Sequence, residues 1–216
     1  MSNLLNPDNK IMNGINRAID AAIIGTLWFI CCIPVITVGA SSTAFYYAYN
    51  KAIRQKRGYA WKEFFSAFKS NFKQSTIIWL IMMVLYLITG LDCIILTALE
   101  KPTTYTKVLF MIIVAIMIAI TVWTLYVFPY LARFANTTKV MLKNSALIAL
   151  ANLPWSILLL ILFGISAFIF LLLPMATFIV PAVYMWIANK IMERIFRKYM
   201  TEEEVKRQEE LEKMDY

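Results

Sequence analysis

The chain has 216 residues, of which 61% are hydrophobic, 14% aromatic and 16% charged. Soluble domains are about 45–50% apolar and about 25% charged, so this composition excludes an ordinary water-soluble globule. The formal net charge is +8, yet only seven charged residues lie between residues 75 and 189. We therefore predict an all-α, polytopic bundle of transmembrane helices that forms one domain over residues 1–216, with an acidic cytoplasmic tail at 200–216.

The first apolar run covers residues 21–40 and contains Pro34. It is either one membrane span or a helix that begins near Gly14, breaks at Pro34 and returns as a second helix over residues 44–54. The break has an unusual local chemistry, because a proline, a glycine and hydroxyl groups adjoin membrane-like sequence. Its residues of interest are Pro34, Thr37, Gly39, Ala40 and Ser41.

Residues 59–74 have an aromatic pattern with helical spacing. The aromatic positions fall on one helix face, and Lys62, Glu63, Lys69 and Lys73 occupy the remainder. This pattern predicts an amphipathic helix in the cytoplasmic interface against anionic lipids. The same face could instead pack on the protein's own bundle or dock a partner. Its residues are Trp61, Phe64, Phe65, Phe68 and Phe72.

The clearest spans are residues 76–99 and 108–128, each long enough to cross a hydrocarbon core of about 30 Å. The short connection at 100–107 makes them an antiparallel hairpin. Residues 155–189 carry no charge and are divided near Pro174, which predicts a second hairpin. Pro181 lies inside its second helix, so we expect a kink there, with the freed carbonyl satisfied by a neighbouring helix or by Thr177.

Two segments are expected on the cytoplasmic side. Residues 129–154 begin at Pro129 and predict a connection with one or two short helices. Residues 191–216 predict a helix leaving the membrane, with a capping-type start at 201–204 of an acidic, solvated helix.

Positive charge indicates the orientation, because short cytoplasmic loops retain Lys and Arg. Segments 41–75, 129–145 and 190–216 hold 17 of the 21 Lys and Arg residues and share one side in either topology. Five spans leave the other four cations outside, whereas six spans with the N-terminus inside leave two. The distribution favours six spans in a plasma membrane, with a cytoplasmic C-terminus.

The sequence contains few of the residues and motifs that are typical of enzyme active sites. There is no histidine, which excludes His-based acid–base catalysis and the Ser-His-Asp arrangement. No glycine-rich phosphate motif is present. Adjacent Cys31 and Cys32 have apolar neighbours and predict small buried hydrophobes rather than a redox or metal site. We therefore predict a protein that is not an enzyme and has no cofactor, metal or nucleic-acid partner, since interfacial lipid accounts for its basic aromatic segments.

Three stretches together resemble one family. They are WFICCIPVITVGASSTA at 28–44, GYAWKEFFSAFKSNFKQSTIIW at 58–79, and the elements FPYLARFANT and LKNSALIALANLP within 126–154. In this order they resemble the YesL-like family of bacterial multi-pass membrane proteins, a domain of unknown function. The resemblance implies an accessory membrane protein associated with ATP-driven sugar transport, with transporter components as partners.

Three further residues are candidates for function. Asp92 is the only carboxylate well inside a span, which is a costly position for a charge. It could line a polar path, or sit near the outer headgroups and pair with Lys101 or Lys107. Arg133 and Asn144 lie beside aromatic residues on the inner side, where they could brace the connection or contact a partner.

These features lead to three hypotheses of function. The first is an accessory or regulatory component of carbohydrate transport, which acts through its cytoplasmic aromatic and basic face. The second is a small transporter or channel that uses the break at 34–41 and Asp92 as a polar path. The third is a structural or lipid-organising protein. Residues 129–154 contain no glycine for a coupling loop, which argues against the permease itself.

Overall fold

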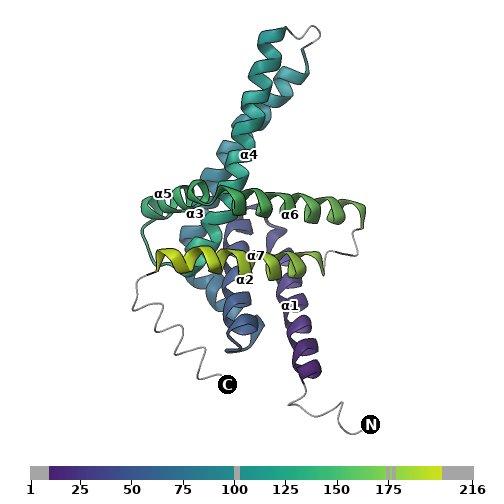
Figure 1. Ribbon diagram of the computed structural model, residues 1–216, viewed down its shortest axis with the longest axis vertical. Coiled ribbons are helices and arrows are strands. Elements are labelled where there is room, and N and C mark those ends of the chain that lie inside the picture. The colour runs from purple at the N-terminus through teal and green to yellow at the C-terminus, as the bar shows by residue number, and fades with distance from the viewer. Residues whose placement is uncertain (1–9, 100–102, 174–175, 177–178, 201–216) are drawn as a thin grey trace.

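The computed structural model describes residues 10–99, 103–173, 176 and 179–200. Every regular element within these residues is helical, which confirms the predicted all-α class. Figure 1 shows a long helical hairpin at one end and a layer of helices that run across its direction.

The N-terminal element is a broken helix. Helix α1 (Lys10–Cys32) ends just before Pro34, a short turn of 3-10 helix (Val35–Thr37) follows, and α2 (Val38–Ala48) returns. Tyr49–Arg54 extends α2 as a π-helical segment. A single span over residues 21–40 is therefore wrong, because proline has no N–H to donate and its ring clashes with the preceding turn.

Helix α3 (Ala60–Thr97) runs without interruption for 38 residues. The amphipathic segment predicted at 59–74 is thus not a separate surface helix, but the first part of the same helix that forms the following span. The polar residues at the junction do not stop it. The Ser75 hydroxyl donates back to the carbonyl oxygens of Asn71 at 2.7 Å and Phe72 at 3.2 Å, so it does not cap a new helix.

Helix α4 (Thr104–Arg133) lies antiparallel to α3 and confirms the first predicted hairpin. The Tyr86 hydroxyl joins the two helices, at 3.2 Å from Oγ1 of Thr121 and 3.3 Å from Oγ1 of Thr124. Pro129 lies inside α4, so the connection to the next helix begins after Arg133 and not at Pro129 as predicted.

The C-terminal part consists of α5 (Thr138–Ala151), α6 (Leu153–Leu172), α7 (Val180–Phe196) and a short turn of 3-10 helix, Arg197–Tyr199. The division between α6 and α7 falls where it was expected, although Pro174 and Thr177 lie outside the described residues, as does the helix expected over 201–216. Pro181 lies in the first turn of α7 and does not kink it. Proline is favoured there, because the first N–H groups of a helix have no intrahelical partner.

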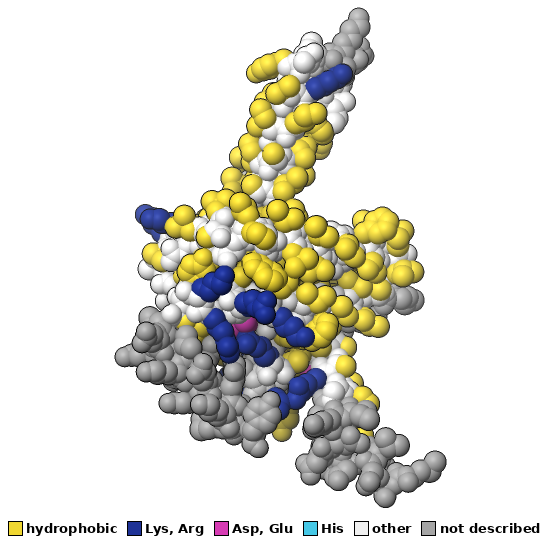
Figure 2. Space-filling model, in the orientation of Figure 1, with side chains coloured by type: hydrophobic (Ala, Val, Ile, Leu, Met, Phe, Trp, Pro, Cys, Tyr) yellow, Lys and Arg dark blue, Asp and Glu magenta, His cyan; other side chains and the backbone are white. Residues whose placement is uncertain are grey.

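Within the described residues, four helices are long and apolar enough to cross a membrane, fewer than the five or six expected: Gly14–Cys32, Ala60–Thr97, Thr104–Arg133 and Leu153–Leu172. Helix α2 has 11 residues, and α7 has 17 that include Lys190, Glu193 and Arg194. Helices α5, α6 and α7 run across the direction of α3 and α4 (Figure 1). Hydrophobic side chains cover the hairpin and α6, whereas Lys and Arg gather lower on the visible face (Figure 2). This surface is that of a membrane protein.

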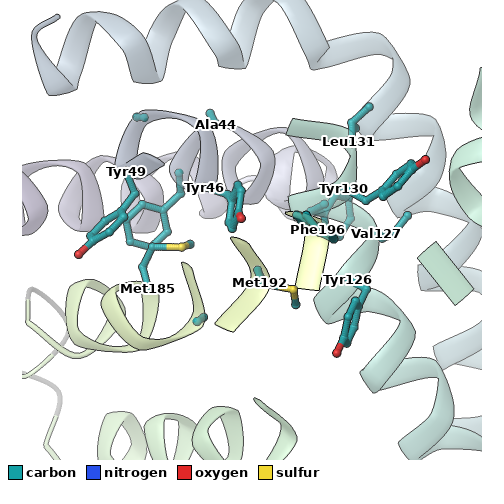
Figure 3. Packing of buried hydrophobic residues seen from close by; sticks show 14 of the residues in the cluster. Ala44, Tyr46, Tyr49, Tyr126, Val127, Tyr130, Leu131, Met185, Met192 and Phe196 are labelled. Atoms are coloured by element: carbon teal, nitrogen blue, oxygen red, sulfur yellow. The ribbon is translucent and has the colours of Figure 1, made fainter. Parts of the chain in front are cut away.

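The core forms where α2, α4 and α7 meet. The ring of Phe196 lies 6.4 Å from that of Tyr46, 6.1 Å from that of Tyr130 and 5.6 Å from that of Phe134, measured between centroids. Figure 3 shows Tyr46, Tyr130 and Phe196 gathered at this junction. The end of α7 is thereby packed between the two other helices.

Candidate functional site

The three stretches that resemble one family meet at Gly39. A Cβ atom on this α2 residue would lie 2.6 Å from the carbonyl oxygen of Ser75, 2.7 Å from Cβ of Trp79 and 2.9 Å from Cε1 of Phe128. Ser75 and Trp79 belong to α3 and Phe128 to α4. Only glycine allows α2 to approach both helices so closely.

Carbonyl groups at the break before α2 accept hydrogen bonds from side chains of the protein itself. The Trp79 indole Nε1 donates to the carbonyl oxygen of Val35 at 2.7 Å. The Thr37 hydroxyl lies 2.5 Å from the carbonyl oxygen of Cys31 and 2.6 Å from that of Pro34. These contacts satisfy carbonyls that the interrupted helix leaves without intrahelical partners.

The following residues, Gly39, Ala40 and Ser41, are buried, and the hydroxyl of Ser41 has no hydrogen-bond partner within the described part of the chain. Pro34 is exposed and Thr37 is half-buried. The segment from Gly39 to Ser41 is therefore closed packing and does not line an open cavity in this structure.

Asp92 does not lie near the helix break at residues 34–41. It is exposed on the second half of α3, 13 residues beyond Trp79. A helix rises about 1.5 Å per residue, so about 20 Å separates the two levels. The two halves of the predicted polar path thus lie apart.

A buried carboxylate that the sequence analysis did not single out lies on α7. The side chain of Glu193 is 1% exposed, and its Oε1 accepts from the Tyr46 hydroxyl at 2.9 Å and from Nδ2 of Asn50 at 3.1 Å. Its Oε2 lies 2.8 Å from a guanidinium nitrogen of Arg54, and its Oε1 lies 3.7 Å from Nε of Arg133. One carboxylate thus joins α2 with its π-helical extension, α4 and α7.

Burial of this charge is costly unless it is paired and hydrogen-bonded, and here both conditions are met. The π-helical segment supplies two of the groups, because Asn50 and Arg54 come from it, and Oδ1 of Asn50 accepts from Arg54 at 3.3 Å. The sequence contained one signal for the burial of Glu193, which is the helical period of α7. It places Glu193 on the face of Met185, Asn189 and Phe196, which are all buried.

Arg133 and Asn144 both contact other helices, but through different partners. Arg133 forms the ion pair with Glu193 described above. Nδ2 of Asn144 donates to the Tyr130 hydroxyl at 3.1 Å, which fixes α5 against α4. Both residues therefore make contacts that join helices.

The aromatic stripe at the start of α3 is divided between core and surface. Phe64 is buried and Phe68 is half-buried, and their rings lie 6.3 Å apart. Trp61, Phe65 and Phe72 are 50%, 45% and 40% exposed. The five residues therefore do not form one lipid-facing surface.

Lys62 lies over exposed rings beside this stripe. Its Nζ is 4.9 Å from the centroid of the Tyr59 ring and 5.5 Å from that of Trp61. We call Tyr59, Trp61, Lys62 and Phe65 the aromatic–basic face.

A polar groove of about 890 Å³ lies at the junction of α2, α3, α4 and the start of α5. Asn71 and Gln74 line it from α3, Arg133 from the end of α4, and Asn136 from the following loop. No group of three His, Cys, Asp or Glu side chains in the described residues could hold a metal ion.

Comparison with known proteins finds a similarity to one family over part of the chain. Residues 21–93 match a family model described as "Protein of unknown function, DUF624", which confirms the resemblance over the first two stretches. The matched region covers the second half of α1, the break, α2 and most of α3. No curated protein and no solved structure matches the chain.

Proposed function

We propose that this chain, which matches the DUF624 family model over residues 21–93, is a non-enzymatic, multi-pass accessory component of a carbohydrate transport system. The description of that family records no function, and the proposal rests on the chain's own geometry and on its resemblance to the YesL-like proteins. The resemblance to the YesL-like proteins is the reason for proposing that the transported substrate is a carbohydrate and that the transporter is ATP-driven.

The proposal places the protein in a bacterial plasma membrane with its cation-rich segments in the cytoplasm. Seventeen of 21 Lys and Arg residues lie in three segments, 41–75, 129–145 and 190–216, which share one side in both the five-span and the six-span topology. The start of α1 and the turn between α2 and α3 lie at the end of the molecule opposite the tip of the α3–α4 hairpin (Figure 1). This arrangement supports a cytoplasmic N-terminus, and the positive-inside distribution supports a cytoplasmic C-terminus.

The aromatic–basic face is the observation that carries the proposal. Trp61 and Phe65 are about half exposed, Tyr59 is more exposed, and Lys62 lies over two of the rings. Clustered exposed aromatic side chains mark interaction surfaces, and Trp and Tyr contribute strongly to protein interfaces. The closed packing at Gly39–Ser41 and the separation of Asp92 give less support to a transporter with its own polar path.

Site-specific photocrosslinking tests the proposal. A photoreactive phenylalanine analogue is placed at Trp61 or Phe65, with Val84 as a matched control, because Val84 is 52% exposed on the same helix. We expect positions 61 and 65 to form adducts with a sugar-transporter component, identified by mass spectrometry, and position 84 to form adducts with lipid.

Adducts with lipid alone at all three positions would contradict the accessory role and favour the lipid-organising hypothesis. Adducts with a transporter component at position 84, and none at 61 or 65, would place the partner on the wrong surface and would also overturn the proposal.

A further inference from the structure

The polar groove has the size of a small-molecule site. Its volume of about 890 Å³ falls within the range of about 300–1,000 Å³ typical of ligand pockets. Its wall joins residues far apart in sequence, since Nε2 of Gln74 donates to the carbonyl oxygen of Asn136 at 2.9 Å. Among the described residues, the lining includes three amide side chains, hydroxyl groups and one guanidinium group, and no carboxylate.

The three amides share one feature. Each uses its NH₂ group on the protein: Nδ2 of Asn71 donates to the carbonyl oxygen of Ala67 at 3.0 Å, Nε2 of Gln74 donates to Asn136, and Nδ2 of Asn136 lies 3.3 Å from the Tyr130 hydroxyl. Their amide oxygens have no hydrogen bond to any described residue. These oxygens only accept, so the groove offers positions for the hydroxyl groups of a ligand.

Arg133 offers the opposite chemistry. Its side chain is 18% exposed, and its buried Nε has no hydrogen-bond partner in the described structure and faces Glu193 only at 3.7 Å. A terminal nitrogen donates to the sulfur of Met200 at 3.6 Å, which is a weak acceptor. The guanidinium therefore retains N–H donors for an anion, and its planar fork matches a phosphate group.

We propose that the groove binds a phosphate ester that bears hydroxyl groups. Arg133 binds the phosphate, and the amide oxygens of Asn71, Gln74 and Asn136 accept from the hydroxyls. Such a group occurs in the headgroup of a glycerol phospholipid and in a soluble sugar or polyol phosphate. This inference is independent of the proposed function, because none of the groove residues belongs to the aromatic–basic face.

Calorimetric titration of the full-length protein in neutral detergent tests the proposal, with sn-glycerol 3-phosphate as the probe and glycerol and inorganic phosphate as comparisons. We expect sn-glycerol 3-phosphate to bind at least tenfold more tightly than either comparison. Arg133→Lys should weaken binding at least tenfold, since it removes the planar fork. Lys139→Gln, an exposed cation of α5 outside the groove, should change it less than twofold.

Asn71→Ala provides a second test in case the Arg133 variant does not fold. It should not disturb the packing of helices, because the Asn71 side chain forms hydrogen bonds only within α3. It should weaken binding of the probe about fivefold and leave inorganic phosphate unaffected. Equal binding of inorganic phosphate and sn-glycerol 3-phosphate, or wild-type binding by both variants, would overturn the proposal.

Nanodiscs distinguish the two sources of the ligand. If the phospholipid headgroup occupies the groove, discs of phosphatidylglycerol should weaken probe binding at least tenfold relative to discs of phosphatidylcholine. If the natural ligand is a soluble ester, binding of the probe should be equal in both discs.

Discussion

Gly39→Ala is expected to lower the free energy of unfolding by about 2 kcal/mol, whereas Gly90→Ala should leave it unchanged or raise it slightly. Both glycines lie in helices, so the gain in helix propensity is shared. A methyl group at residue 39 would lie 2.6 Å from the backbone oxygen of Ser75, and nothing lies within 4 Å of one at residue 90. Overpacking of this kind costs about 1–3 kcal/mol.

The measurement is unfolding in mixed micelles, followed by the signal of the tryptophans. Equal stability of the two variants would show that α2 does not approach α3 and α4 as closely as the structure has it. The contact at Gly39 between the three stretches that resemble the family would then not explain why they occur together.

Glu193→Ala is expected to cost about 3–5 kcal/mol, because it leaves the guanidinium groups of Arg54 and Arg133 facing each other without the carboxylate between them. Glu63→Ala is the matched control. Glu63 pairs with Lys51 at 2.8 Å, the same distance as the pair of Glu193 with Arg54, but Lys51 and Glu63 are more exposed. Its loss should therefore cost about 1 kcal/mol or less.

The same unfolding assay decides the outcome. A loss of similar size in the two variants would contradict the account of Glu193 as a buried centre that joins α2, α4 and α7. Glu193→Gln should fall between wild type and Glu193→Ala, because an amide oxygen can still accept from Tyr46 although the charge is lost.

Local signals predicted the α3–α4 hairpin and gave the broken N-terminal helix as one of two interpretations. Pro34 lacks an N–H whatever surrounds it, and the two apolar runs of the hairpin are joined by a short connection. The continuity of α3 was missed because composition changes sharply near Ser75. A change from amphipathic to apolar sequence alters which surroundings a helix prefers, but it does not stop the helix.

The buried centre depended on packing that a charge count along the chain does not contain. Glu193 lies among the charged residues that follow the last apolar run, and this position suggested a solvated tail. The period of α7 puts Glu193 on an apolar face, and its partners Tyr46 and Arg133 lie 147 and 60 residues away in the chain. The groove beside Arg133 is equally non-local, since its walls come from four segments.

The closed packing at Ser41 distinguishes an accessory protein from a transporter with a polar path at the break. It is tested by thiol labelling of Ser41→Cys in native membranes, in a variant whose Cys31, Cys32 and Cys93 are replaced by alanine. Lys143→Cys on the exposed side of α5 serves as the positive control. We predict that the cysteine at residue 41 stays unlabelled by a water-soluble maleimide until the protein is denatured, whereas the cysteine at residue 143 reacts at once. Labelling at residue 41 as fast as at residue 143 would mean that water reaches the break, and would contradict the account.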